Sequence, residues 1–214
     1  MTANPLNPLA NVDCDGDGLS NATECNAGTH PGDECSYTYT TAAQVCTFVL
    51  ANPTRPLALA DCDLGGVINI TECQEGTNPL DPADDAGTLS GNQWKDTNGN
   101  GIQDGIEVGL NGVNVILKDV FGVPITSTIT ATGGPNNLPG YYQFTNLAPG
   151  SYIVMFVRPS GYDLTKKDAS GSNDTNDSDA DPTTGNAPVV TLVSGESNQT
   201  IDAGLYRTSS LGDF

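Results

Sequence analysis

The chain has 214 residues, which is enough for one or two small domains. It carries 26 Asp and Glu residues against 7 Lys and Arg residues, and its formal charge is −19. This balance excludes nucleic acid and anionic membranes as partners, because the cationic groups that neutralise phosphates are missing. The sequence also lacks an apolar run of about 18 residues, so we expect no membrane insertion within it.

The first element in chain order is an acidic loop, DCDGDGLSNATEC, at residues 13–25. Carboxylates placed on alternate residues repel one another unless a cation lies between them. The spacing D-x-D-x-D-G-x5-E is that of a twelve-residue calcium loop, in which Gly18 allows the sharp turn and the closing glutamate binds through both oxygens. The predicted ligands are Asp13, Asp15, Asp17, the Leu19 carbonyl, Asn21 and Glu24.

This loop belongs to a unit that occurs twice, because residues 4–33 align without a gap with residues 52–81. Shared positions include D-C-D, N-x-T-E-C and G-T-x-P-x-D, so two copies of one unit are present. The second copy has Gly65 at the fifth loop position, where the first copy has Asp17. Because charge count helps to set calcium affinity, we expect this second site to be weaker, filled by water, or empty. Its predicted ligands are Asp61, Asp63, the Val67 carbonyl, Asn69 and Glu72.

Each loop leads into a predicted short helix, because an asparagine followed three residues later by a glutamate is typical of a helix start. The helices are expected to begin at Asn21 and Asn69 and to end near Gly28 and Gly76. Helices this short supply few core contacts. We therefore expect metal and disulfides to hold this region together.

All six cysteines lie before residue 74, and none forms the CxxC pair that a zinc site would need. Disulfides in an oxidising, extracellular setting fit better. Three equal intervals favour local pairing, with the segment SYTYTTAAQVCTFVLA as a small β excursion after the first copy. A bridge from Cys35 to Cys62, which would join the copies, is a competing alternative. The equal intervals run from Cys14 to Cys25, from Cys35 to Cys46 and from Cys62 to Cys73.

The motif D-x-D-G-D-G-L-S-N followed by G-T-x-P-x-D resembles the calcium-binding repeats of thrombospondin type 3, in the form common in bacterial surface proteins. The resemblance covers residues 4–85, and it is degenerate in the second copy. It implies that acidic residues after G-T-x-P also help to bind metal. By position these are Asp33, Asp81, Asp84 and Asp85.

A domain boundary is predicted near residues 82–88, where prolines and small polar residues gather and the cysteines have stopped. We therefore divide the chain into a repeat region at 1–85 and a second domain at 86–208. In the second domain, seven short apolar segments alternate with Gly, Pro and Asn turns, which predicts an antiparallel β-sandwich. The expected core residues are Val113, Val115, Leu117, Tyr142, Phe144, Tyr152, Val154, Val190 and Leu192.

Another twelve-residue loop, DTNGNGIQDGIE, lies between the first two predicted strands. Its side chains are more neutral than those of the first loop, but it matches the calcium template completely. Gly101 takes the turn position. The predicted ligands are Asp96, Asn98, Asn100, the Ile102 carbonyl, Asp104 and Glu107.

Further on, the segment KKDASGSNDTNDSDADPTTG gathers five aspartates. One interpretation is a solvated, flexible loop. The other is a further calcium site, or a pair of sites, that ties this loop to the sandwich, which brings the total to about three to five calcium ions. The candidate ligands are Asp168, Asn173, Asp174, Asn176, Asp177, Asp179 and Asp181.

The second half carries W-K-D-T-N-G-N-G-I-Q-D-G-I-E, then Y-x-F-T-N-L-x-P-G-x-Y, D-S-D-A-D and D-A-G-L-Y. These motifs resemble the B domains of serine-aspartate repeat surface proteins over residues 88–207. The resemblance implies a calcium-binding, immunoglobulin-like sandwich used in tandem in the stalk of cell-wall adhesins. The expected fold class is therefore mainly β, with this sandwich preceded by a small repeat region with short helices. SSLGDF at 209–214 resembles the opening of a following module.

An enzyme is not expected, because the single histidine, His30, has no partners for a nucleophilic triad and the well-spaced acids already fit calcium loops. We expect a calcium-rigidified structural or stalk module of a large secreted or cell-surface bacterial protein. Neighbouring modules of the same polypeptide would be its partners. The alternative is an adhesion module that itself contacts a host protein, a glycan or a surface. Both interpretations place the chain outside the cell, as a fragment of a longer protein.

Overall fold

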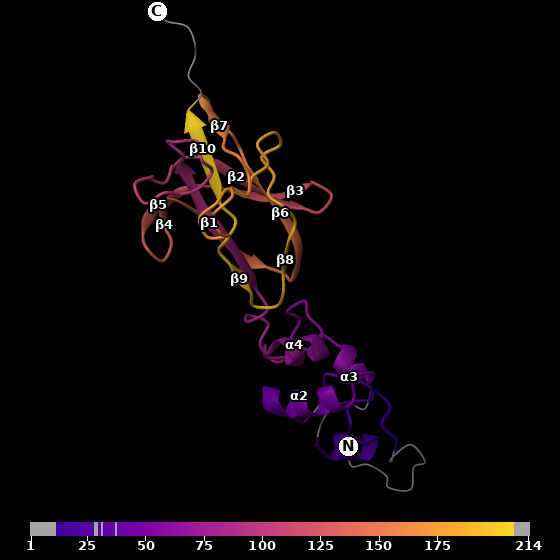
Figure 1. Cartoon of the computed structure of the whole chain (residues 1–214). Coiled ribbons are helices and arrows are strands. Elements are labelled where there is room, and N and C mark those ends of the chain that lie inside the picture. Colours follow the sequence, from indigo (N-terminus) through magenta and orange to yellow (C-terminus); the bar gives the residue numbers. More distant parts are fainter. Residues whose placement is uncertain (1–11, 28–29, 31, 37, 208–214) are drawn as a thin grey trace, which may run out of the picture. The chain divides into compact units, whose positions relative to one another are not determined.

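The computed structural model describes residues 12–207 except 28–29, 31 and 37 (Figure 1). The chain divides into two compact units, Met1–Ala86 and Gly87–Phe214. No helix within the described part is long and apolar enough to cross a membrane. The predicted start of a following module at 209–214 lies outside the described residues.

The described part of the first unit contains four short helices, which the acidic loops and longer turns connect (Figure 1). One helix begins at Asn21 in the first repeat copy and another begins at Asn69 in the second, as predicted. In the second copy, Ile68 rather than Asn69 is the N-cap, and Gly76 ends the helix in a left-handed conformation. The predicted end near Gly28 lies outside the described residues. The helices are α1 Asn21–Ala27, α2 Ala42–Ala51, α3 Pro56–Leu59 and α4 Asn69–Glu75.

The predicted β excursion at residues 36–51 is wrong, because most of this segment forms α2. Thr41 caps the helix N-terminus, and its side chain accepts a backbone hydrogen bond from the first turn. Val45 and Val49, one helical turn apart, are both fully buried and pack in one cluster with Leu57 of α3. The apolar residues thus follow the helical period, and their burial forms the small core of the unit.

Two disulfides, Cys35–Cys62 and Cys46–Cys73, join the segment between the copies to the second copy. The competing bridge from Cys35 to Cys62 is confirmed, and local pairing is wrong for these four cysteines. Equal intervals along the chain could not reveal that α2 lies beside α4, which brings Cys46 to Cys73. Cys14 is exposed and unpaired among the described side chains, which do not include that of its predicted partner Cys25.

The second unit consists of two β-sheets, which confirms the predicted mainly β sandwich (Figure 1). One sheet has the strand order β4-β5-β1-β10-β7, with β9 also paired to β1, and the other has the order β3-β2-β6-β8. The strands are β1 Gly87–Lys95, β2 Asn114–Asp119, β3 Pro124–Ile129, β4 Ala131–Gly133, β5 Leu138–Leu147, β6 Gly150–Phe156, β7 Tyr162–Leu164, β8 Val190–Leu192, β9 Ser197–Asn198 and β10 Ala203–Arg207.

The sandwich is not purely antiparallel as predicted, because β1 pairs in parallel with β10 and with β9. In the β1–β10 ladder, Gln93 lies opposite Ala203 and Lys95 lies opposite Leu205. Parallel neighbours need a long connection, and here all the intervening strands of the domain supply it. The first and last strands of the domain are therefore direct neighbours.

One hydrophobic core is shared by the two sheets of the second unit. Tyr142 of β5 lies at its centre, in edge-to-face contact with Phe144 at 5.7 Å and with Phe156 at 5.6 Å between ring centroids. Its hydroxyl donates to the Ile201 carbonyl. The predicted core residues lie in this cluster, with Tyr152 and Val190 at its partly buried edge. The alternation of apolar residues along each strand predicted this core correctly.

Candidate calcium sites

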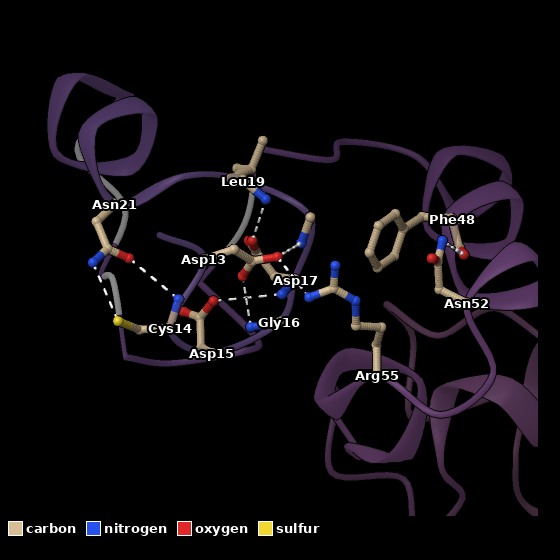
Figure 2. Close-up of polar contacts among 11 residues, drawn as sticks. Asp13, Cys14, Asp15, Gly16, Asp17, Leu19, Asn21, Phe48, Asn52 and Arg55 are labelled. Carbon is tan, nitrogen blue, oxygen red and sulfur yellow. Dashed lines mark hydrogen bonds and ion pairs between the residues drawn. The ribbon is translucent and has the colours of Figure 1, made fainter. Parts of the chain in front are cut away.

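The loop before α1 is held in shape by its own carboxylates (Figure 2). Asp13 accepts hydrogen bonds from the Gly16 N–H at 2.7 Å and the Gly18 N–H at 3.2 Å, and Asp17 accepts one from the Leu19 N–H at 2.7 Å. Both glycines adopt left-handed φ angles, 79° and 98°, which turn their N–H groups toward Asp13. The acidic side chains therefore gather on the inside of the turn, as metal ligands would.

The carboxylates of this loop are close together and largely buried. Oxygens of Asp13, Asp15 and Asp17 lie within 4.8 Å of one another, and Asp17 and Glu24 are fully buried. Within the described part of the chain, Asp17 Oδ2 and both Glu24 oxygens have no hydrogen-bond partner. Burial, followed by the charges of Asp15, Asp17 and Asp13, raises the pKa of Glu24 to about 7. Unpaired buried carboxylates are costly unless a cation compensates them.

The two predicted asparagine ligands and Asp13 make contacts that the calcium template does not include. Asn21 bonds Cys14, accepting from its N–H at 3.3 Å and donating to its sulfur at 3.2 Å (Figure 2). Asn69 accepts from the Cys62 N–H at 3.4 Å in the same way. In each loop, the asparagine thus links the cysteine at the second loop position to the helix that follows the loop. Arg55 forms an ion pair with Asp13 at 3.0 Å, which adds a cationic neighbour at the rim of the first loop.

The loop before α4 contains a second buried acidic group. Asp61 accepts from the Gly66 N–H at 3.1 Å, as Asp13 does in the first loop. Carboxylate oxygens of Asp63, Glu72 and Asp85 lie within 4.8 Å of one another. Glu72 is fully buried, and neither of its oxygens has a hydrogen-bond partner among the described residues. Burial and then the neighbouring carboxylates, Asp63 first, raise the pKa of Glu72 to about 8.

All three predicted loops share one backbone conformation, with left-handed residues at positions four and six. These residues are Gly16 and Gly18, Leu64 and Gly66, and Gly99 and Gly101. Leu64 is the one residue of these six that is not a glycine. A leucine with a φ of 68° costs about 1 kcal/mol relative to the right-handed region. Its side chain is 84% exposed, so packing does not compensate this cost. The second loop therefore keeps the backbone conformation of the other two loops despite an unfavourable residue.

Replacing Leu64 by asparagine is expected to stabilise the first unit by about 0.5–1 kcal/mol, because asparagine tolerates the left-handed conformation and no buried contact is lost. Thermal unfolding in calcium would measure the gain. The matched control is Ile106→Asn, since Ile106 is 91% exposed in the third loop without a positive φ. A melting temperature of Leu64→Asn at or below that of the wild type would contradict the strain argument.

The third loop follows β1 and is also organised by its first residue. Asp96 is 1% exposed and accepts from the N–H groups of Gly99 at 2.7 Å and Gly101 at 2.8 Å. The Thr165 hydroxyl donates to its second oxygen. This pattern matches that of Asp13, so the same local sequence produces the same loop in both units.

The remaining side chains of the third loop converge on Asp104. The amides of Asn98 and Asn100 both donate to Asp104 Oδ2, at 2.7 and 3.0 Å. Glu107 accepts from the Thr97 N–H at 2.6 Å and from the Asp104 N–H at 3.2 Å. Rotation of an asparagine amide by 180° exchanges its nitrogen and oxygen, so the same positions can present oxygens to a cation. Unlike Glu24, whose two oxygens have no partner among the described residues, Glu107 accepts hydrogen bonds from the backbone.

The acidic segment 166–185 makes backbone contacts with the third loop. Ile102 and Asp177 form an isolated antiparallel bridge, and the Gln103 N–H donates to the Asn176 carbonyl at 2.7 Å. Asp177 is 6% exposed; one oxygen accepts from Ser172, and the other has no partner in the described part of the molecule. Asp177 is therefore the best-placed candidate ligand in this segment.

The other predicted ligands of this segment are not gathered at one point. Asp168 and Asp174 are exposed, and Asp168 pairs with Lys167 at 3.1 Å. Asp181 accepts from the Thr184 and Thr183 N–H groups, and these hydrogen bonds lower its pKa. Two further members make contacts within the segment, since the Asn173 oxygen accepts from Thr175 and the Asn176 oxygen accepts from the Asn173 N–H.

Asp179 instead joins a buried residue that sequence reasoning missed. Its Oδ2 accepts from the Asp202 N–H at 2.7 Å, and burial raises its pKa to about 7. Asp202 is 2% exposed, accepts from the Asn92 N–H at 2.6 Å, and has a pKa raised well above its usual range by burial. The only available signal was an aspartate at the start of the apolar strand segment DAGLY.

Among the four acids that the repeat resemblance implied, the structure brings Asp85 into an acidic group. Asp84 lies nearby and accepts from the Asn78 N–H at 2.9 Å. Asp81 caps its own turn by accepting from the Ala83 N–H at 3.1 Å. Asp33 approaches the first loop through its backbone, since its N–H donates to an oxygen of Asp15 at 3.0 Å.

The second unit is a two-sheet β-sandwich with an acidic loop after its first strand. These features define the class of domain to which this part of the chain belongs. The chain belongs to the SdrD B-like domain family, which matches residues 87–205. It is 45% identical over 123 residues to the serine-aspartate repeat-containing protein F of Staphylococcus epidermidis, covering 56% of this chain and 7% of the relative. The corresponding protein C of Staphylococcus aureus is 42% identical over 123 residues, with 56% and 12% covered.

This chain therefore spans a small fraction of the length of these relatives. Among solved structures, it is similar to GBS52, the minor pilin of Streptococcus agalactiae, with a TM-score of 0.37 and 14% identity over 61% of this chain and 48% of that one. The thrombospondin-type resemblance of residues 4–85 stays a prediction.

Proposed function

We propose that the chain is a calcium-stabilised structural module of a larger protein at the bacterial cell surface. The observation that carries this proposal is the burial of two closing glutamates, Glu24 and Glu72, whose oxygens have no hydrogen-bond partner among the described residues. Each lies in a loop with the backbone of a calcium site and near further carboxylates. A doubly charged cation would compensate these charges, and calcium prefers such oxygen ligands.

Each loop would contribute its inward-facing oxygens to one ion. Bound calcium would supply positive charge and would link loop positions that otherwise repel one another. In the third loop, the asparagine amides would turn their oxygens inward, and Asp177 would add a carboxylate from the neighbouring segment. The residues that would hold the ions are Asp13, Asp15, Asp17 and Glu24; Asp61, Asp63 and Glu72; and Asp96, Asn98, Asn100, Asp104 and Glu107.

Two observations support a structural role rather than a catalytic one. Asp13, Asp61 and Asp96 accept hydrogen bonds from backbone N–H groups of their own loops, and the family of the second unit is the SdrD B-like domain. The serine-aspartate repeat proteins that carry such domains are far longer than this chain. We propose that this chain is one of several consecutive modules, with neighbouring modules of the same polypeptide as its partners.

A calorimetric calcium titration tests this proposal. The wild type is expected to bind one ion at each of the three loops, with dissociation constants of about 10⁻⁴ to 10⁻³ M or tighter. Glu24→Gln and Glu107→Gln are each expected to remove one binding event, because each takes away the closing ligand of a different loop. Glu75→Gln, an exposed glutamate on α4, is the control and should leave all three events. Titrations without heat or saturation in the wild type would refute the proposal.

A further inference from the structure

The second repeat loop lacks a side chain at its fifth position, yet the space beside that position is filled. A Cβ atom added to Gly65 would overlap Oδ2 of Asp85 and would lie 3.1 Å from Oδ1 of Asp63. In the first loop, the fifth position is Asp17, whose carboxylate belongs to the acidic group inside the turn. The two loops share left-handed residues at positions four and six, so their fifth positions point the same way. Asp85 thus occupies the place that an aspartate at position 65 would take.

The surroundings of Asp85 fit a metal ligand. Asp85 is 1% exposed, and its carboxylate shares a 4.8 Å group with those of Asp63 and Glu72. An independent observation comes from Glu72, which is fully buried in this group with both oxygens lacking a hydrogen-bond partner in the described part of the chain. A buried carboxylate that faces two others and has no protein donor stays ionised only when a cation compensates its charge.

Each repeat copy has an acid at only one of two equivalent positions. A shift of 48 residues pairs Asp17 with Gly65 and pairs Tyr37 with Asp85. The first copy therefore has an acid in the loop and a tyrosine after it, whereas the second has a glycine in the loop and an acid after it. Neither copy has both acids, and a Cβ at Gly65 would overlap Asp85, so the structure explains why one excludes the other.

We propose that Asp85 replaces the missing fifth ligand of the second loop, so that Asp61, Asp63, Glu72 and Asp85 form a complete calcium site. This inference rests on the proposed function and changes one expectation drawn from the sequence. The second site then has four carboxylates and therefore the same ligand charge as the first site, which has Asp13, Asp15, Asp17 and Glu24. Because charge count helps to set affinity, the two sites have similar affinities. The site also links the loop to the last residues of the first unit.

The test uses the full chain with its disulfides formed and calcium as the probe. The amide signals of residues 13–24, 61–72 and 96–107 are followed by NMR during the titration, so that each loop reports its own binding. Asp85→Asn is expected to weaken binding at the second loop by at least about tenfold and to leave the first and third loops unchanged. Glu75→Gln is the matched control, because it removes one charge from an exposed residue of α4 that lies outside the acidic group of the second loop. It should change affinity by less than about threefold.

A swap distinguishes a ligand from a structural residue. Gly65→Asp alone is expected to weaken the second site, because two carboxylates then compete for one space. The double variant Gly65→Asp, Asp85→Ala reproduces the layout of the first loop and should restore wild-type affinity to within about threefold. Failure of the swap, or equal affinities of Asp85→Asn and Glu75→Gln, would overturn this inference while the wild type still binds calcium. Absence of binding at all three loops of the wild type would instead overturn the proposed function.

Discussion

Chelation of calcium at pH 7.5 is expected to destabilise the first unit strongly and to leave the stability of the sandwich nearly unchanged. The first unit has a small core around Val45, Val49 and Leu57, whereas both sheets of the sandwich share one larger core. A site held at 100 times its dissociation constant contributes about 2.7 kcal/mol. Two such sites contribute about 5.4 kcal/mol, which is comparable with the total stability of the less stable small domains, about 5 kcal/mol. At about 4–8 °C per kcal/mol, their loss lowers the melting temperature of the first unit by about 20 °C or more.

Hydrogen exchange measured by mass spectrometry would show which segments of the chain lose stability in chelator. Amides within residues 12–86 should lose protection in chelator, and those of the sandwich strands should keep it. The third loop should change only locally, since Asp96 and Glu107 already have protein partners. Adding reductant to the chelator should complete the unfolding, because the two disulfides restrain the unfolded chain. Protection of the first unit that is independent of calcium would contradict this expectation.

The calcium-free first unit is expected to lose stability as pH rises from about 5 to about 8, the reverse of ordinary acid denaturation. The pKa of Glu72 rises from 4.5 to about 8 in the folded state, chiefly through burial, and that of Glu24 rises to about 7. Folding therefore favours the protonated acids. Their contribution is fully present below the unfolded pKa and is lost as pH rises through the folded pKa. Calcium binding requires deprotonated ligands, so stabilisation by calcium grows over the same range.

Melting temperatures measured from pH 5 to pH 8, in chelator and in calcium, would reveal both trends. Glu72→Gln should flatten the decline in chelator and should reduce the gain from calcium, because glutamine neither ionises nor clamps the ion with two charged oxygens. Glu75→Gln on the same helix provides the control and should follow the wild type. A first unit whose stability in chelator is constant or increasing between pH 5 and pH 8 would show that these glutamates are not buried without a cation.

The local features of the acidic loops could be predicted from the sequence, because their geometry depends on residues within twelve positions. Asp13 and Asp96 make the same backbone bonds in two different units, which explains why one spacing pattern identified both loops. The alternation of apolar residues predicted the sandwich core for a similar reason. By contrast, the segment VCTFVLA has no clear period over its short length, and burial of Val45 and Val49 on one helical face decided its structure.

Features that depend on distant residues escaped prediction from spacing. The bridge from Cys46 to Cys73 depends on how two helices pack. The second loop has Gly65 where the first has Asp17, and nothing within the loop reveals that Asp85 lies beside Gly65. Asp202 is similar, since only the fold brings it beside Asp179. In the acidic segment, composition suggested one cluster, but short-range capping by residues such as Asp181 disperses it.

The parallel pairing of β1 with β10 determines how the sandwich carries mechanical tension. β1 begins at Gly87 and β10 ends at Arg207, and the two strands run side by side in the same direction. A force that pulls these two points apart acts along the strands in opposite directions and slides one past the other. In this shear geometry the ladder hydrogen bonds bear the load together, whereas an antiparallel pair pulled at neighbouring ends opens one bond at a time. The Asp96 N–H extends this ladder to the Leu205 carbonyl at 2.9 Å, so the third loop is anchored at the loaded end.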